Sequence, residues 1–204
     1  MISSSHIIIG GIVCDFLKQR LNINLNRQSF IRGNVIPDYS MLGIIQPHFP
    51  KMSLGFVQKE IAALSEGYLD SENIGVNYSL NLGIVCHYLS DFFCYAHSAV
   101  YKQFVINHVR YEKELHKYLE ANRKQILKKL SPFENLGRSA EEIKKKLNSL
   151  LREYNASAVH DFERDIGYII KVCVYAAMSV ISCALEHSAA ADEVLSLEPS
   201  PLII

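Results

Sequence analysis

The chain has 204 residues, of which 49% are hydrophobic and 21% are charged, and its formal net charge is zero. This composition is typical of a globular protein with a sizeable core, and the length fits a single domain over residues 1–204. A neutral chain has no long-range electrostatic field that would favour nucleic acid or an anionic membrane surface.

The apolar periodicity predicts helices throughout and no strand, so the expected fold class is all-α, a single-domain helical bundle. In chain order, helices are expected over about residues 5–21, 53–65, 74–98, 106–129, 139–153 and 159–187. A loop is expected over residues 22–40, where Gly33, Pro37 and Asp38 are turn formers. Two prolines bracket His48 and hold it on a second irregular segment.

The segment from Ile166 to Leu185 is apolar apart from Lys171 and a few tyrosines and serines. A stretch of about 20 such residues is long enough to cross a bilayer. However, a lysine at the centre of a span is costly, and an all-α protein needs one helix that is apolar all round. We therefore expect a buried central helix and no transmembrane segment.

The cysteines and the N-terminus predict a cytoplasmic location. The cysteines are odd in number and widely spaced, which favours reduced thiols over a disulfide framework. They are Cys14, Cys86, Cys94, Cys173 and Cys183. No basic residue precedes the apolar run over residues 7–13, and two glycines interrupt that run, so no signal peptide is expected.

The most informative stretch contains two histidine–carboxylate pairs. His87 and Asp91 are four residues apart, and so are His108 and Glu112. On an α-helix this spacing places both side chains of a pair on one face, where imidazole and carboxylate can bind zinc or a similar divalent ion. One such pair is more often a surface contact, but two neighbouring pairs favour a site with several metal ions.

His97 follows Asp91 by six residues, and both lie within the predicted helix 74–98. On a straight helix this separation is about 9 Å along the axis and about 120° around it. An ion held by His87 and Asp91 could then not reach His97. The expected partners of His97 are therefore His108 and Glu112 on the next helix.

The first ion needs further ligands from the early part of the chain. The candidates there are His6 at a helix start, and Asp38 and His48 in the irregular segments. A carboxylate has two oxygens, so Asp91 could bridge two ions. Asp38, His48 and His87 would then hold one ion and His6 another. Three further histidines are interpreted as neighbours or structural residues: His116, His160 and His187.

These residues, in this order and spacing, resemble the zinc-dependent phospholipase C family, which is distantly related to the fungal single-strand zinc nucleases. The resemblance covers about residues 6–112 and implies an all-helical fold with two or three bound zinc ions. It assigns one zinc to Asp38, His48, His87 and Asp91, and another to His97, His108 and Glu112.

The same resemblance assigns the remaining zinc to His6 and Asp91, together with the amino group and carbonyl of the N-terminal residue. That residue is usually tryptophan in the family and is Met1 in this chain. Met1 lies only five residues before His6, so its amine can reach the ion that His6 binds. Ile2 is too large for efficient removal of Met1, which keeps Met1 as the expected ligand.

The resemblance also implies cleavage of a phospholipid head group. Two or three zinc ions would clamp the phosphate ester, and Asp38 would orient the attacking water or accept its proton. Tyr39 matches a tyrosine of the family's choline-binding cage. Ile45 stands where its aromatic partner is expected, and residues 3–5 offer no acidic side chain. The resemblance therefore does not define which head group is bound.

Two alternatives to a phospholipase remain at this point. A single-strand nuclease or nucleotidase would use the same metals with aromatic side chains for stacking, and the chain contains 11 tyrosines and 9 phenylalanines. A nucleic-acid substrate is therefore compatible with the sequence. The second alternative is a non-catalytic helical protein stabilised by metal. The sequence does not indicate an oligomeric state.

Overall fold

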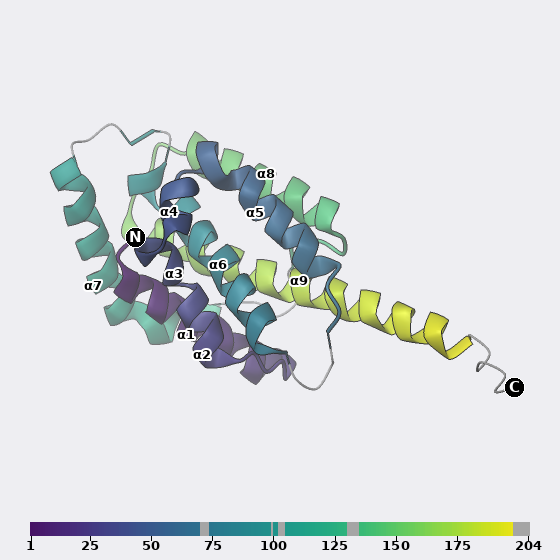
Figure 1. The fold of residues 1–204 in the computed structure, drawn as a ribbon. Helices are drawn as coiled ribbons and strands as arrows, with labels where there is room; N and C mark the ends of the chain where they lie inside the picture. The colour runs from purple at the N-terminus through teal and green to yellow at the C-terminus, as the bar shows by residue number, and fades with distance from the viewer. Residues whose placement is uncertain (70–73, 99, 102–104, 130–134, 198–204) are drawn as a thin grey trace, which may run out of the picture.

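The computed structural model describes residues 1–69, 74–98, 100–101, 105–129 and 135–197 (Figure 1). These residues form an all-α fold, as expected, with one isolated bridge between Leu25 and Ile74. The α-helices are α1 (Ser3–Leu21), α2 (Arg27–Gly33), α3 (Ile36–Tyr39), α4 (Met41–Ile45), α5 (Pro50–Ser65), α6 (Val76–Phe92), α7 (Val105–Lys129), α8 (Ala140–Ala156) and α9 (Phe162–Leu197). A short 3-10 turn, η1 (Tyr95–His97), follows α6.

The segment over residues 22–40, expected to be a loop, contains the two helices α2 and α3. Asn26 caps α2, because its side chain accepts a hydrogen bond from the backbone N–H of Ser29 at 3.0 Å. Pro37 lies in the first turn of α3, where a missing N–H costs nothing. The turn-forming residues therefore begin short helices instead of a loop.

The prediction of one long helix over residues 74–98 was also wrong at the C-terminal end. Helix α6 ends at Phe92, and His97 lies on η1. The reason is a contact from α9: the carboxylate of Asp165 accepts a hydrogen bond from the backbone N–H of Tyr95 at 2.7 Å. Since this amide is satisfied outside the helical ladder, the chain can leave α6 inside the protein without an unpaired donor.

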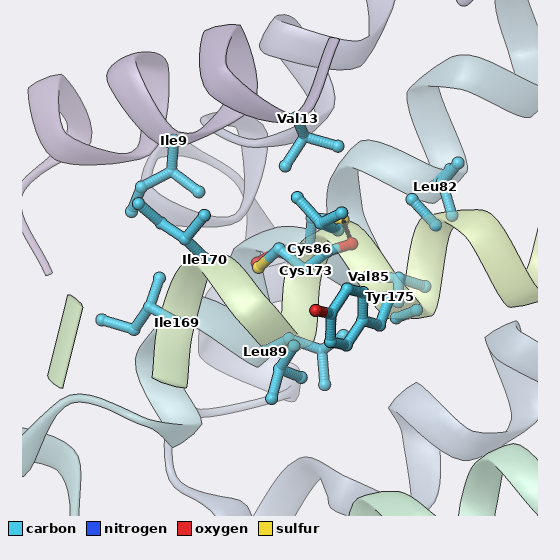
Figure 2. Packing of buried hydrophobic residues seen from close by; sticks show 14 of the residues in the cluster. Ile9, Val13, Leu82, Val85, Cys86, Leu89, Ile169, Ile170, Cys173 and Tyr175 are labelled. Atoms are coloured by element: carbon cyan, nitrogen blue, oxygen red, sulfur yellow. Dashed lines mark hydrogen bonds between the residues drawn. The ribbon is translucent and has the colours of Figure 1, made fainter. Parts of the chain in front are cut away.

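Helices α6 and α9 form the centre of the core. Every residue from Val85 to Cys94 is buried, and α9 contacts α1, α5, α6, α7 and α8. Within α9, residues 162–191 are long and apolar enough to cross a membrane, but 78% of the most apolar window is buried inside the protein. Figure 2 shows side chains of α9, such as Ile170 and Cys173, packed against side chains of α1 and α6, such as Val13 and Cys86. All five cysteines are free and buried.

Two glycines allow α2 to lie directly against α6. A Cβ atom on Gly83 would lie 2.2 Å from the carbonyl oxygen of Phe30, and a Cβ atom on Gly33 would lie 2.0 Å from that of Leu80. Neither distance is tolerable between a carbon and an oxygen atom, so only glycine fits at these two positions. The close approach brings the backbone that follows α2 to the side chains of α6.

Replacing Gly83 by alanine should lower the free energy of unfolding by about 1–3 kcal/mol, the usual cost of inserting extra atoms into a packed interior. Gly55 in α5 is the matched control, because nothing lies within 4 Å of a Cβ atom added there. Gly55→Ala should raise the stability by about 0.5–1 kcal/mol, since alanine favours the helix. Denaturant unfolding followed by circular dichroism measures both variants, and equal stability would contradict the close contact.

Candidate metal centre

Helix α6 carries a histidine and an aspartate in its buried part. His87 and Asp91 are completely buried, although the residues around them are apolar. Burying a carboxylate is costly unless it is paired with positive charge, hydrogen-bond donors or a metal ion. The polar groups that surround Asp91 therefore define the site.

The two oxygens of Asp91 face different sets of groups. Oδ2 lies 2.8 Å from His48 Nδ1 and 3.4 Å from His87 Nε2. Oδ1 contacts the amino group of Met1 and lies 3.4 Å from His6 Nε2 and 3.7 Å from His97 Nε2. One carboxylate thus lies between two groups of nitrogen donors, which is the geometry of a bridging ligand.

The candidate ligands gather in three clusters among the described residues. In each cluster the ligand atoms lie within 4.8 Å of one another. The clusters are His6, His87 and Asp91; Asp38, His48 and His87; and His97, His108 and Glu112. In the third cluster, Glu112 Oε1 lies 2.9 Å from Nε2 of both His97 and His108.

Backbone carbonyls orient two of the histidines. His87 Nδ1 donates a hydrogen bond to the carbonyl oxygen of Asn34 at 2.8 Å, and His97 Nδ1 donates to that of His48 at 3.1 Å. A carbonyl can only accept, so Nδ1 carries the proton in each ring and the Nε2 lone pair points into the cluster. Metal-binding histidines are usually held in this way.

His6 provides a test of whether the site fits a metal ion. Its side chain is completely buried and its ring stacks on that of His87, with 4.0 Å between the centroids. Neither ring nitrogen makes a hydrogen bond to a described residue, although Nε2 points at Asp91. An imidazole nitrogen buried without a partner is unusual. Together with the carboxylates and imidazoles nearby, it forms a donor set that suits zinc.

The electrostatics of the centre favour neutral histidines and ionised carboxylates. Burial lowers the pKa of His87 and of His97, so both are neutral near pH 7, as metal ligation requires. Burial opposes the charge on Asp91, but the Met1 ammonium outweighs this effect and holds the pKa of Asp91 well below its usual value. The pKa of Glu112 is likewise lowered against the effect of burial, by a hydrogen bond from His108 and by the nearby Met1 ammonium.

The amino group of Met1 is also buried, which disfavours its charge. The carboxylates of Asp91 and Glu112 nevertheless raise the pKa of this amine to about 11. The nitrogen lies 3.0 Å from His97 Nε2 and 3.2 Å from Glu112 Oε1. It therefore lies between the first and third clusters, and an ion that binds this amine must displace a proton.

The centre has a closed floor and an open mouth. His6, His87 and Asp91 are fully buried, whereas the side chains of Asp38, His48 and His108 are 17%, 18% and 24% exposed. Among the described cluster members, these three side chains are the most exposed to solvent, and we call them the mouth of the centre.

The structure brings together every side chain that the sequence pointed to as a ligand, and the ligand roles themselves stay predictions. His97 joins His108 and Glu112 as expected, but the straight helix assumed for that argument was wrong. The turn at η1 places His97 Nε2 only 3.7 Å from Asp91, so the third cluster adjoins the other two.

Two further residues singled out from the sequence, His116 and Tyr39, lie near the clusters, and their roles stay predictions. His116 makes a hydrogen bond with Ser5 Oγ at 3.0 Å and belongs to none of the three clusters. Tyr39 is 78% exposed beside the mouth, and its hydroxyl makes a hydrogen bond with Ser3 Oγ at 3.1 Å. Ser3 lies between Tyr39 and Asp38, since the two residues share its hydroxyl.

Sequence reasoning missed several residues that position the centre. Ser3 Oγ lies 2.6 Å from Asp38 Oδ2, and Asn34 fixes the His87 ring through its backbone carbonyl. A Cβ atom on Gly43 would lie 2.9 Å from His48 Nε2. Ser3 and Asn34 give no signal in the sequence, because a hydroxyl or a carbonyl of this kind is present almost everywhere. Gly43 can be read from the sequence, but its contact with the His48 ring cannot.

Asp165 is the most consequential of the missed residues. Besides the backbone N–H of Tyr95, its carboxylate accepts hydrogen bonds from the hydroxyls of Tyr154 at 2.6 Å and Tyr111 at 2.9 Å. Tyr95 begins η1, which carries His97, and Tyr111 directly precedes Glu112. One carboxylate on α9 thus holds both elements that supply the third cluster.

Replacing Asp165 by alanine should leave these buried donors unpaired and lower the free energy of unfolding by about 3 kcal/mol or more. Metal bound at the third cluster should fall as well. Asp161, an exposed residue that accepts a hydrogen bond from Arg164 N at 2.8 Å, is the matched control. Its alanine variant should lose only about 1 kcal/mol. Chemical denaturation and metal analysis check both variants, and equal losses would contradict the role of Asp165.

Comparison with known proteins tests the family resemblance. The sequence model of the family described as zinc-dependent phospholipase C matches residues 5–161. No curated protein and no solved structure gave a match. The matched range spans more than half of the chain and includes all the candidate ligand side chains from His6 to Glu112. The family supports a metal-dependent hydrolase that acts on phosphoric esters. The chain therefore belongs to the zinc-dependent phospholipase C family.

Proposed function

We propose that this protein is a zinc-dependent phosphoric diester hydrolase that removes the phosphorylated head group of a phospholipid, as a phospholipase C does. The observation that carries the proposal is the position of Asp91, whose two oxygens face different sets of nitrogen donors. A bridging carboxylate of this kind supports ions placed close enough to act on one phosphate ester.

The three clusters would hold two or three zinc ions, with Asp38, His48, His87 and Asp91 at one position and His97, His108 and Glu112 at another. His6 and Asp91 would hold a third ion together with the amino group of Met1. When bound, these ions supply Lewis-acid stabilisation of the phosphate and lower the pKa of water near it.

Asp38 is the proposed proton acceptor. Its side chain is partly exposed at the mouth, and Ser3 Oγ fixes one of its oxygens at 2.6 Å. The other oxygen lies 3.8 Å from both His48 Nδ1 and His87 Nε2. A carboxylate held in this way can orient the attacking water and take its proton. The products would be a diacylglycerol-like alcohol and a phosphorylated head group.

Tyr39 is the proposed contact for the head group. Its ring is exposed beside Asp38, and an aromatic face next to a carboxylate can bind a quaternary ammonium group. Ile45, at the position where the resemblance expects an aromatic partner, is aliphatic, so this contact is weaker than a complete aromatic cage would provide.

Metal analysis of the untagged protein combined with a substrate panel tests the proposal. The panel contains a phospholipid, bis(p-nitrophenyl) phosphate and a single-stranded oligonucleotide. Bound zinc with release of phosphorylated head group is the expected result, and Asp38→Asn should abolish release while zinc stays bound elsewhere. Cleavage of the oligonucleotide alone would favour a nuclease. Bound zinc without turnover of any substrate would favour a structural metal site.

A further inference from the structure

Large apolar side chains face the solvent in the segment that links the two mouth residues Asp38 and His48 and continues just beyond it. We call this group the apolar rim. Its members, between 42% and 78% exposed, are Tyr39, Met41, Ile44, Ile45, Phe49 and Met52. Single exposed apolar side chains are normal, but a contiguous group marks an interaction surface.

Helix α4 directs part of the apolar rim outward. Met41, Ile44 and Ile45 follow the spacing i, i+3, i+4, which places them on one side of the helix. Leu42 is partly buried and packs against the core. The helix is therefore anchored by one apolar side chain and exposes three others.

The apolar rim is attached directly to the candidate metal centre. Gly43 lies so close to His48 that a Cβ atom there would be 2.9 Å from Nε2 of the ring. The ring centroids of Phe49 and His97 are 5.5 Å apart. In Figure 1, α4 lies beside the N-terminus, at the end of the molecule opposite the C-terminal end of α9. A surface bound by the rim would therefore lie next to the mouth.

Helix α7 adds apolar side chains next to the third mouth residue. Ile106 and Val109 are exposed and flank His108 in the sequence. Each of the three mouth residues thus has exposed apolar neighbours. This distribution suits an extended apolar partner better than a single small pocket.

The charges around the apolar rim favour a phospholipid surface. No aspartate or glutamate occurs from residue 39 to residue 59, and Lys51 in the middle of this segment is exposed. Arg32 lines a cavity of about 480 Å³ next to the rim, together with Ile7, Ile31 and Tyr39. Apolar side chains flanked by cations, in a segment that has no carboxylate after the candidate ligand Asp38, are suited to phosphate head groups and the acyl chains beneath them.

We propose that the apolar rim inserts into the surface of a phospholipid bilayer and so presents the mouth of the metal centre to the lipid head groups. This inference rests on the proposed function for its choice of lipid as the partner. Binding to the bilayer and hydrolysis are nevertheless separate measurements, so either can fail without the other.

A tryptophan reporter tests the insertion. The chain contains no tryptophan, so Ile44→Trp introduces a single fluorophore into the apolar rim. Vesicles of equimolar phosphatidylcholine and phosphatidylserine should shift its emission to the blue, and brominated lipids should quench it. Val76→Trp is the control, because Val76 is exposed and lies about 22 Å along α6 from Asp91 at 1.5 Å per residue. Emission from Ile44→Trp that stays unchanged would overturn the proposal.

A second variant, M41S/I44S/M52S, removes apolar surface without touching a proposed ligand or substrate contact. Co-sedimentation with the same vesicles should fall by at least about tenfold relative to wild type and to the control Val76→Ser. Hydrolysis of soluble bis(p-nitrophenyl) phosphate and zinc content should stay within about twofold. Undiminished vesicle binding would overturn the proposal.

Two further outcomes separate the proposals. A wild-type protein that binds vesicles through the apolar rim but hydrolyses no phosphodiester would support the docking surface and contradict the proposed function. A wild-type protein that hydrolyses soluble substrate, ignores vesicles and forms a dimer that M41S/I44S/M52S dissociates would overturn the bilayer as the partner. The rim would then be an interface with a second copy of the chain.

Discussion

Replacing Asp91 by asparagine should remove most of the bound zinc and lower phosphodiester hydrolysis by at least about 100-fold. Loss of an outer partner of a metal ligand typically costs 10–100-fold, and Asp91 is placed to serve as a direct ligand to two ions. Asparagine keeps the size of the side chain but carries no charge. The buried amino group of Met1 would then lose its closest carboxylate.

The metal-free variant should also lose about 3–5 kcal/mol of stability, the usual cost of leaving a buried charge without its partner. Asp15→Asn is the matched control, since Asp15 pairs with Arg27 at 2.6 Å and Arg123 at 3.4 Å on a more exposed part of the fold. Zinc content by mass spectrometry and initial rates measure the effect. Wild-type zinc content in Asp91→Asn would refute the bridging role.

Adding residues before Met1 should lower zinc occupancy and phosphodiester hydrolysis by about tenfold or more. The amino group of Met1 is buried against Asp91, and a peptide bond at this nitrogen would abolish its charge and its capacity to bind an ion. From the sequence alone, the ion at the third cluster would be expected to stay bound, because the resemblance assigns the Met1 amine to the ion of His6 and Asp91. The structure changes this expectation, because the Met1 nitrogen lies 3.2 Å from Glu112. We therefore expect the ion between His97, His108 and Glu112 to be weakened as well.

The same extension placed at the other end of the chain is the control for this experiment, and protease removal of the N-terminal extension should restore both zinc and activity. A protein extended before Met1 that still binds three zinc ions and hydrolyses its substrate at the full rate would show that the amine is not a ligand. The ion at His6 and Asp91 would then need another donor.

The candidate ligands could be found from sequence because their spacing is local. His87 with Asp91, and His108 with Glu112, lie one helical turn apart, and this geometry holds wherever the helix packs. The end of α6 could not be predicted in the same way. It depends on Asp165, which reaches Tyr95 from a helix far along the chain. Contacts between distant segments leave no periodic pattern, so the position of His97 required the structure.

The short helices α2 and α3 escaped prediction for a related reason. Residues 22–40 contain glycine, proline and asparagine, which favour turns when read locally. In the structure these residue types act in other ways: Asn26 caps α2, Pro37 begins α3, and Gly33 permits the contact with α6. Local propensity was overridden by packing, and the register that brings Asn34 to His87 follows from that packing alone.

The candidate ligands and the helix that holds them in place come from different parts of the chain, and this order has a consequence for biosynthesis. All members of the three clusters precede residue 113, whereas α9, which packs against α6 and supplies Asp165, is made after them. A nascent chain therefore displays its histidines and carboxylates before the helix that holds them in place has left the ribosome. Domains generally acquire their packing only as complete units. We therefore expect zinc to bind after α9 has been translated, when the three clusters are already assembled.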